Sequence, residues 1–131
     1  MYIRFITEFR NEDGDVETGV FQALAYLIRS GHAFEYDLNH LKDLKAWFNA
    51  YLDKPKKFSK SKRSNAEPKA LSWFKDSAIR HLEKMYELKA ALEKYDITVS
   101  VIKKEQPGYI IYEDDYQVAT LPFKADRHLV K

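Results

Sequence analysis

Six Lys and Arg residues lie within twelve positions near the middle of the chain, and this cluster is the first candidate for chemistry. Segment 53–64 reads D-K-P-K-K-F-S-K-S-K-R-S, with six basic residues and one acidic residue. Such a charge density attracts phosphate groups, and an aromatic ring within it can stack on a base. The predicted ligand-binding residues are Lys56, Lys57, Phe58, Lys60, Lys62 and Arg63. The competing interpretation is a solvated connection that is rich in lysine for solubility.

The charge of the rest of the chain limits this hypothesis. The formal net charge is +2, so residues outside the +5 segment carry −3 together. A broad nucleic-acid surface needs positive charge over more than one loop. The composition therefore predicts a binding module that contacts a nucleic acid or a phosphorylated small molecule through one segment.

A histidine within a predicted apolar helix face is the second candidate. In a partly dry setting His81 could act as a general base. The alternative hypothesis is therefore a small enzyme in which His81 and Lys75 share a pocket with Tyr109 or Tyr112. No Ser or Asp completes a triad at a diagnostic spacing, and the histidines show no metal-ligand spacing. A hydrogen-bonded core histidine is the competing interpretation, and no metal or cofactor is expected.

The third candidate is a tyrosine-rich hairpin near the C-terminus. Tyr109, Tyr112 and Tyr116 flank three consecutive acidic residues. Tyrosines of this kind can line a pocket or a contact between subunits. Ordinary β-propensity followed by a solvated turn explains the same pattern.

The longest periodic stretch predicts the helix that would position several of these groups. It runs from Ser64 to Asp96, opens with a capping-box spacing between Ser64 and Glu67, and has Pro68 in its first turn. Its apolar positions recur at steps of three and four, as on one face of an amphipathic helix. They are Leu71, Phe74, Ala78, Leu82, Met85, Leu88, Leu92 and Tyr95. A helix starting at Ser64 would also direct free N–H groups at an anion on the basic segment.

The remaining elements follow from shorter patterns. Alternation predicts a strand over 2–10, and helical periodicity predicts helices over 18–30 and from an Asp37 N-cap to residue 52. Period-two patterns predict three strands, 97–102, 109–112 and 116–121, joined as a meander. The fold class is therefore α+β, with two layers and a four-stranded, largely antiparallel sheet. Three helices complete it, in the order β-α-α-α-β-β-β.

Length and composition limit the class of protein. A chain of 131 residues fits one α+β domain, predicted over 1–123, with a tail at 124–131. Cysteine is absent, which excludes disulfides and sulfur-ligated zinc. No window approaches the roughly 18 apolar residues of a membrane-spanning helix. We therefore expect a soluble, cytoplasmic protein without a membrane partner.

Four segments together resemble a group of short bacterial proteins with no assigned function. They are V-F-Q-A-L at 20–24, W-F-N-A-Y-L-D-K-P-K-K-F at 47–58, S-W-F-K-D-S-A-I-R-H at 72–81 and P-G-Y-I-I-Y-E-D-D-Y-Q-V at 107–118. The resemblance implies a bacterial, cytoplasmic origin. It carries no activity, ligand or site residue.

Self-association is the last prediction. Trp73 lies roughly 100° around the predicted helix from Phe74, so one sheet contact would leave it partly exposed. Exposed aromatic groups often mark an interface, and symmetric dimers are the commonest oligomers. We expect a homodimer that uses Trp73 or the edge of the hairpin, unless the two earlier helices cover Trp73 within one chain.

Overall fold

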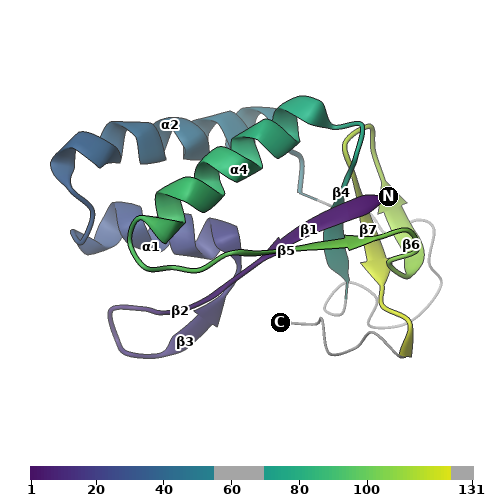
Figure 1. Ribbon diagram of the computed structural model, residues 1–131, viewed down its shortest axis with the longest axis horizontal. Coiled ribbons are helices and arrows are strands. Elements are labelled where there is room, and N and C mark those ends of the chain that lie inside the picture. The colour runs from purple at the N-terminus through teal and green to yellow at the C-terminus, as the bar shows by residue number, and fades with distance from the viewer. Residues whose placement is uncertain (55–69, 125–131) are drawn as a thin grey trace. The chain divides into compact units, whose positions relative to one another are not determined.

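The fold is α+β, as the sequence predicts, but its elements follow a different order. The structure is a computed structural model that describes residues 1–54 and 70–124. Its elements are β1 (Tyr2–Ile6), β2 (Glu8–Arg10), β3 (Val16–Thr18), α1 (Val20–Ser30), α2 (Glu35–Tyr51), β4 (Leu71–Lys75), α4 (Ile79–Glu93), β5 (Ser100–Lys104), β6 (Tyr109–Glu113) and β7 (Gln117–Leu121) (Figure 1). The predicted order β-α-α-α-β-β-β is wrong, since β2, β3 and β4 were not expected as separate strands.

The chain divides into two compact units. Of the described residues, unit 1 holds 1–4, 54, 70–82 and 102–124, and unit 2 holds 5–53 and 83–101. The boundary falls inside β1, α4 and β5, so these three elements contribute residues to both units. Most strand pairing belongs to unit 1, whereas unit 2 contains α1, α2 and most of α4.

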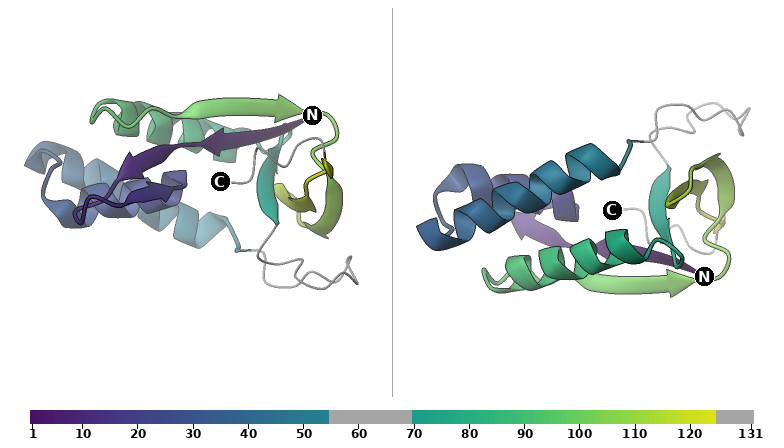
Figure 2. Two further views of the ribbon diagram at one scale, coloured as in Figure 1. Left: turned by 90° about the horizontal axis from the view of Figure 1, so that it is seen from below. Right: turned by 90° about the horizontal axis from the view of Figure 1, so that it is seen from above.

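One sheet has five strands rather than the four predicted. Its order is β5-β1-β4-β7-β6, and the pairs β1–β4, β4–β7 and β7–β6 are antiparallel. Trp73 of β4 stands opposite Val118 of β7 in the register. In both views of Figure 2, β4 lies beside the β6–β7 hairpin. The predicted hairpin is therefore confirmed. The predicted three-strand meander is wrong, because β5 neighbours β1 at the opposite edge.

The predicted helix from Ser64 to Asp96 is wrong in its first half. Leu71–Lys75 form strand β4, and helix α4 begins only at Ile79. Between them, the N–H of Ala78 donates to the carbonyl of Lys75 over 3.0 Å and closes a turn. Trp73 and its neighbour Phe74 are both buried, because β4 is covered on both faces. A strand buried on both faces loses its period of two, and its apolar positions then resemble a helical stripe.

Trp73 lies in the core of unit 1 instead of on a surface. Its exposed fraction is 1%, and it packs with Leu71 and Val118. All five residues of β7 are buried, as expected for a strand with neighbours on both sides and side chains covering both faces. Because Trp73 is enclosed within one chain, the prediction that it forms a dimer interface is wrong.

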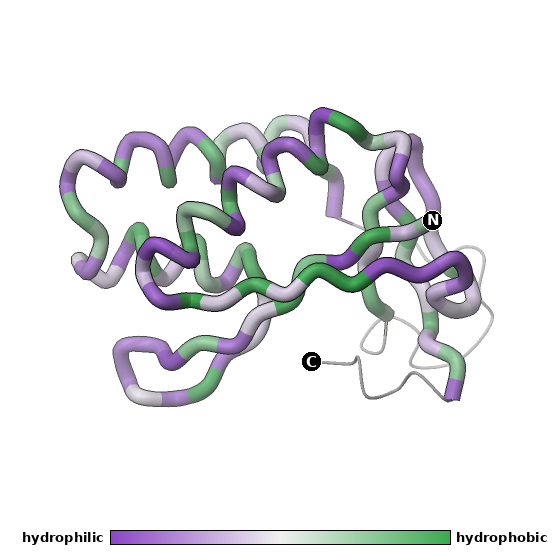
Figure 3. The backbone as a smooth tube through the Cα atoms, in the orientation of Figure 1, coloured by the Kyte–Doolittle hydropathy of each residue, from purple (hydrophilic) through white to green (hydrophobic). Residues whose placement is uncertain are grey.

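Unit 2 is built on helices whose apolar faces the sequence predicts well. In α1 the buried residues Val20, Ala23, Leu24 and Leu27 follow the helical spacing. Gly31 ends α1 with a φ of 78°, the left-handed conformation that favours glycine after a helix. In Figure 3, apolar and hydrophilic stretches alternate along α2, as they do on an amphipathic helix. Across residues 1–54 and 70–124, no helix combines the length and apolar character needed to cross a membrane.

The predicted strand over 2–10 is interrupted at Thr7. The carbonyl of Thr7 accepts a hydrogen bond from Gly19, and its hydroxyl donates to the carbonyl of Thr98. After this break β2 pairs with β3 in a separate two-stranded sheet. The N-terminal residues therefore serve two sheets, a change that strict alternation does not reveal.

Candidate functional site

The basic segment that the sequence singles out lies outside the described residues. Lys56, Lys57, Phe58, Lys60, Lys62 and Arg63 all fall within 55–69. The helix that was expected to support an anion there does not run through residues 71–75, which form β4. The hypothesis of a phosphate-binding segment therefore rests on its charge.

The predicted catalytic residues all lie in unit 1, but they do not form one open site. His81 is only 5% exposed, and its ring stacks on Tyr116 with centroids 4.2 Å apart. Lys75, which lies on a strand instead of a helix, forms an ion pair of 2.7 Å with Glu113. Tyr109 is half exposed and meets the ring of Phe123 edge-on. The stacking of Tyr116 on His81 was not predicted.

Tyr112 belongs to a hydrogen-bonded turn. Its hydroxyl donates to Asp114 over 2.8 Å, and Asp114 also accepts from the backbone N–H groups of Tyr116 and Gln117 and from the Gln117 amide. Partial burial alone would raise the pKa of Asp114, but these hydrogen bonds outweigh it and hold the pKa below its ordinary value. The carboxylate stabilises the β6–β7 turn, which is a structural role.

A buried cation lies elsewhere in unit 1. Burial lowers the pKa of Arg4 to about 10, and one of its terminal nitrogens donates to the carbonyl of Ser72 over 2.8 Å. Its Nε and the indole Nε1 of Trp73 are buried without a hydrogen-bond partner among the described residues. Arg4 is the last residue of β1 that belongs to unit 1, and it follows Ile3, which pairs with Phe74 of β4. Its guanidinium therefore links β1 to β4 within unit 1.

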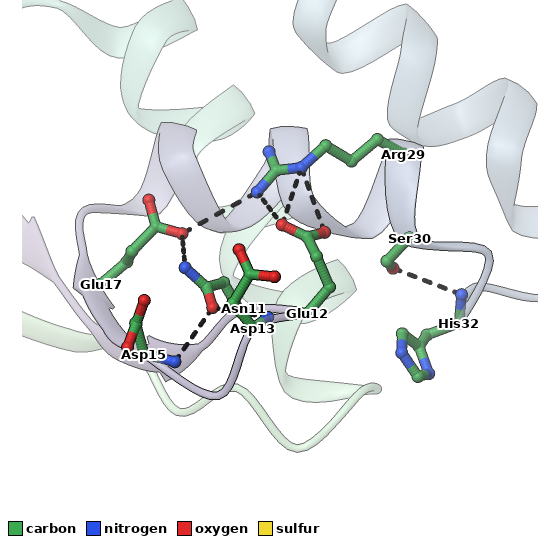
Figure 4. Close-up of polar contacts among 8 residues, drawn as sticks. All are labelled: Asn11, Glu12, Asp13, Asp15, Glu17, Arg29, Ser30 and His32. Atoms are coloured by element: carbon green, nitrogen blue, oxygen red, sulfur yellow. Dashed lines mark hydrogen bonds and ion pairs between the residues drawn. The ribbon is translucent and has the colours of Figure 1, made fainter.

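The acidic loop between β2 and β3 is held by an arginine of α1. Figure 4 shows the Arg29 guanidinium directed at Glu12, with the nearest atoms 3.0 Å apart, and at Glu17, 3.8 Å away. Asn11 donates to Glu17 and accepts from the backbone N–H groups of Asp13 and Asp15. No group of three or more His, Asp or Glu side chains within 1–54 and 70–124 is arranged to hold a metal ion. The cluster therefore shapes the hairpin loop.

A cluster at the start of α2 involves the residue expected to cap that helix. The N-cap is Phe34, so the prediction of Asp37 as N-cap is wrong. Asp37 instead accepts a hydrogen bond from the Tyr95 hydroxyl and pairs with Lys94 at 2.9 Å. These two contacts hold the pKa of Asp37 below its ordinary value, and Asp37 raises the pKa of Lys94. The Lys94 ammonium also lies 4.7 Å from the ring centre of Tyr36.

A cavity of about 400 Å³ lies next to this cluster, entirely within unit 2. It is lined by residues 8–10, Tyr26, Leu27, His32 and residues 94–97. These groups come from β2, the end of α1 and the turn after α4, which are far apart in the sequence. The volume suits a small molecule. Sequence reasoning missed this cavity, since none of its residues forms a motif with another.

No protein-family model, curated protein or solved structure matches the chain. The resemblance to short bacterial proteins therefore stays a prediction. Function has to be inferred from the charges, contacts and cavity of this chain alone.

Proposed function

We propose that this protein is a non-enzymatic binding module whose segment 53–64 contacts an anionic ligand, either a nucleic acid or a phosphorylated small molecule. The observation that carries the proposal is the concentration of six basic residues against one acidic residue in that segment. Charges of one sign at this density cannot be neutralised within the segment. They attract a polyanion over a Debye length of about 10 Å at 0.1 M salt.

The rest of the chain does not compete for such a ligand. Within residues 1–54 and 70–124 there are 14 basic and 18 acidic residues. Many of these basic groups are already paired with carboxylates. The pairs are Arg29–Glu12, Lys75–Glu113, Lys84–Glu87, Lys89–Glu93 and Lys94–Asp37. Positive potential is therefore concentrated at the basic segment, and a ligand would be bound locally.

The local environments of the candidate catalytic groups favour binding over catalysis. A general base must reach the proton that it abstracts, and His81 is almost fully buried. Lys75 and Tyr112 are engaged by Glu113 and Asp114. The contacts of His81 and Lys75 therefore do not favour the small-enzyme hypothesis. We keep it as the alternative, which activity assays would test.

The basic segment can be tested by binding labelled single-stranded RNA, single-stranded DNA and nucleotides across a salt series. In the test variant the segment loses five charges by Ser substitution, and in the matched control five exposed basic residues elsewhere are replaced by Ser. The test set is Lys56, Lys57, Lys60, Lys62 and Arg63. The control set is Lys42, Lys45, Arg80, Lys103 and Lys124. Comparing the polymers with free nucleotides distinguishes the two kinds of ligand.

We expect binding at about 50 mM salt that weakens steeply as salt increases. Each neutralised phosphate of a single strand contributes about −0.7 to the slope of log K against log salt. The segment variant should flatten that slope and bind at least about tenfold more weakly, while the control variant binds nearly as the parent does. Absence of binding at about 50 mM salt, or equal losses in the two variants, would contradict the proposal.

Self-association is a second candidate function, favoured by one observation. β6 is an outermost strand of the five-stranded sheet, and its Tyr109 and the nearby Tyr116 are 51% and 44% exposed. An edge strand with aromatic groups suits pairing with a second copy. Light scattering at about 10 μM protein tests it, since a dimer weaker than that is marginal. A mass of 15.5 kDa corresponds to the monomer and would exclude this function.

A further inference from the structure

The loop between β2 and β3 contains the only Asp or Asn of the sequence that is followed by glycine, the pair Asp13–Gly14. Both residues are exposed, and a Cβ added at Gly14 would meet no atom within 4 Å. Gly14 has a φ of 82°, in the left-handed region that favours glycine. Within residues 1–54 and 70–124, the Asp13 carboxylate makes no hydrogen bond or ion pair (Figure 4). An exposed carboxyl group and an unhindered backbone nitrogen are therefore adjacent in this loop.

Hydrogen bonds to Asn11 restrain the backbone around that nitrogen. The N–H of Gly14 donates to the carbonyl of Asn11 over 3.0 Å. The Asn11 side-chain oxygen accepts from the N–H groups of Asp13 and Asp15, over 2.9 Å and 3.0 Å. One side chain therefore fixes the amides on both sides of Gly14. A reaction of the Gly14 nitrogen requires this turn to open, and exposed loops open locally at a small cost in free energy.

We propose that Asp13 is a site of spontaneous isomerisation to isoaspartate, and that the Asn11 side chain limits its rate. The Gly14 nitrogen attacks the Asp13 carboxyl carbon, a C–N bond forms, and the carboxyl OH leaves as water with the N–H proton. In the resulting succinimide, the Gly14 nitrogen is bonded to two carbonyl carbons. Water then adds to one of them. Breaking the original peptide bond gives isoaspartate, whereas breaking the new bond restores Asp, so the net composition is unchanged and water is the only co-reactant.

Isomerisation changes the geometry of the loop. The main chain of isoaspartate passes through the former side-chain carbons, so it is one carbon longer before Gly14. The longer chain displaces the N–H groups that donate to Asn11. Glu12 belongs to the same loop and pairs with Arg29 of α1 at 3.0 Å, so the modification also loosens that contact. This site is independent of the basic segment and of the function proposed for it.

The test incubates the full chain in buffer for several weeks, beside the same chain unfolded in urea. Trypsin releases residues 11–29 as one peptide, which contains both Asp13 and Asp15. Isoaspartate has the mass of Asp, so chromatography separates the two forms and electron-transfer fragmentation locates the modified residue. Asn11→Ala removes the side-chain acceptor. Asn39→Ala is the matched control, because Asn39 is an exposed residue of α2, and circular dichroism reports whether each variant is folded.

We expect isoaspartate at Asp13 in the folded parent, formed more slowly than in urea, and none at Asp15, because the β-branched Val16 hinders attack there. Loss of two hydrogen bonds should raise the rate at least about threefold in folded Asn11→Ala. Asn39→Ala should age like the parent. If Asn11→Ala does not keep its fold, the folded and unfolded parent still provide the comparison, and equal rates would contradict the restraint by the loop. No conversion of Asp13 in the folded parent, equal conversion of Asp15, or an unchanged rate in folded Asn11→Ala would overturn the proposal.

Discussion

The two tryptophans show how differently the two units use large aromatic groups. Trp73 of unit 1 is 1% exposed and packs inside the sheet, with its indole N–H lacking a hydrogen-bond partner among the described residues. Trp47 of unit 2 is only partly buried, contacts Tyr51 and Phe48 on its own helix, and has the Lys84 ammonium 5.9 Å from its ring. Unit 1 therefore encloses its tryptophan in the core, whereas unit 2 leaves its tryptophan at the edge of the packing.

The polar groups follow the same division. In unit 1, Arg4, His81 and Gln117 lie within or against the sheet. In unit 2, several charged residues form exposed ion pairs, among them Arg29 with Glu12 and Lys94 with Asp37. A buried polar group fixes the packing around it, while an exposed one can exchange partners with a ligand. The buried polar groups of the unit 1 sheet are therefore expected to matter more for stability than the exposed ion pairs of unit 2.

The largest effect should follow Trp73→Ala. Removing a fully buried indole leaves a cavity and should lower the free energy of unfolding by about 3–5 kcal/mol. Trp47→Ala is the control. It should lower the free energy of unfolding by less than about 2 kcal/mol, because the Trp47 ring lies at the edge of the packed core. Chemical denaturation followed by circular dichroism measures both. Equal losses for the two variants would remove the distinction between buried and surface aromatics.

A smaller effect should follow Asp114→Ala, with the exposed Asp115→Ala as control. The change removes the acceptor of several hydrogen bonds in the β6–β7 turn. Because solvent screens a partly exposed carboxylate, the free energy of unfolding at pH 7 should fall by only about 1–2 kcal/mol. The lowered pKa of Asp114 sets the pH dependence. Its contribution is complete above the ordinary value of 3.8 and is lost as the pH falls through the lower folded value.

Denaturation of the parent and of Asp114→Ala at pH 7, 5 and 3 measures this pH dependence. The difference between the two proteins should remain constant down to about pH 4 and shrink below it. A difference that grows on acidification would show that the carboxylate is not the stabilising form.

The smallest effect should follow Lys94→Met in unit 2. Lys94 and Asp37 form an exposed pair, and such pairs contribute little to stability because water and salt screen them. The raised pKa of Lys94 means that any contribution is present below the ordinary value of 10.5 and disappears as the pH rises through the higher folded value.

The midpoint of denaturation at pH 7 should therefore be nearly unchanged in Lys94→Met, at both low and high salt. A shift as large as that of Asp114→Ala would mean that the surface cluster of unit 2 holds the fold together, and that the division between the units is incorrect.

Parts of the fold were predictable because a local sequence pattern specifies them. Helix α1 and its end at Gly31 follow from the spacing of Val20, Leu24 and Leu27, and the β6–β7 hairpin follows from a short acidic turn between two apolar runs. In each case one local pattern corresponds to one local structure. The basic segment is likewise a property of composition, and its candidate residues need no fold to be recognised.

Tertiary contacts decided the rest. Leu71, Phe74 and Ala78 have the spacing of a helix, but β4 pairs with β1 on one edge and with β7 on the other. Side chains of both its faces, those of Trp73 and Phe74, are buried. Thr7 ends β1 within a run that alternates as if it were one strand, because its backbone carbonyl bonds Gly19.

The cavity depends on still more distant partners. Its lining residues come from β2, the end of α1 and the turn after α4. A sequence pattern records which positions are buried, and the sequence alone therefore determined the amphipathic helices, the hairpin and the uneven charge. What covers a buried position, and which distant side chains meet, depends on packing between elements, so only the tertiary structure decided the strand at β4 and the cavity.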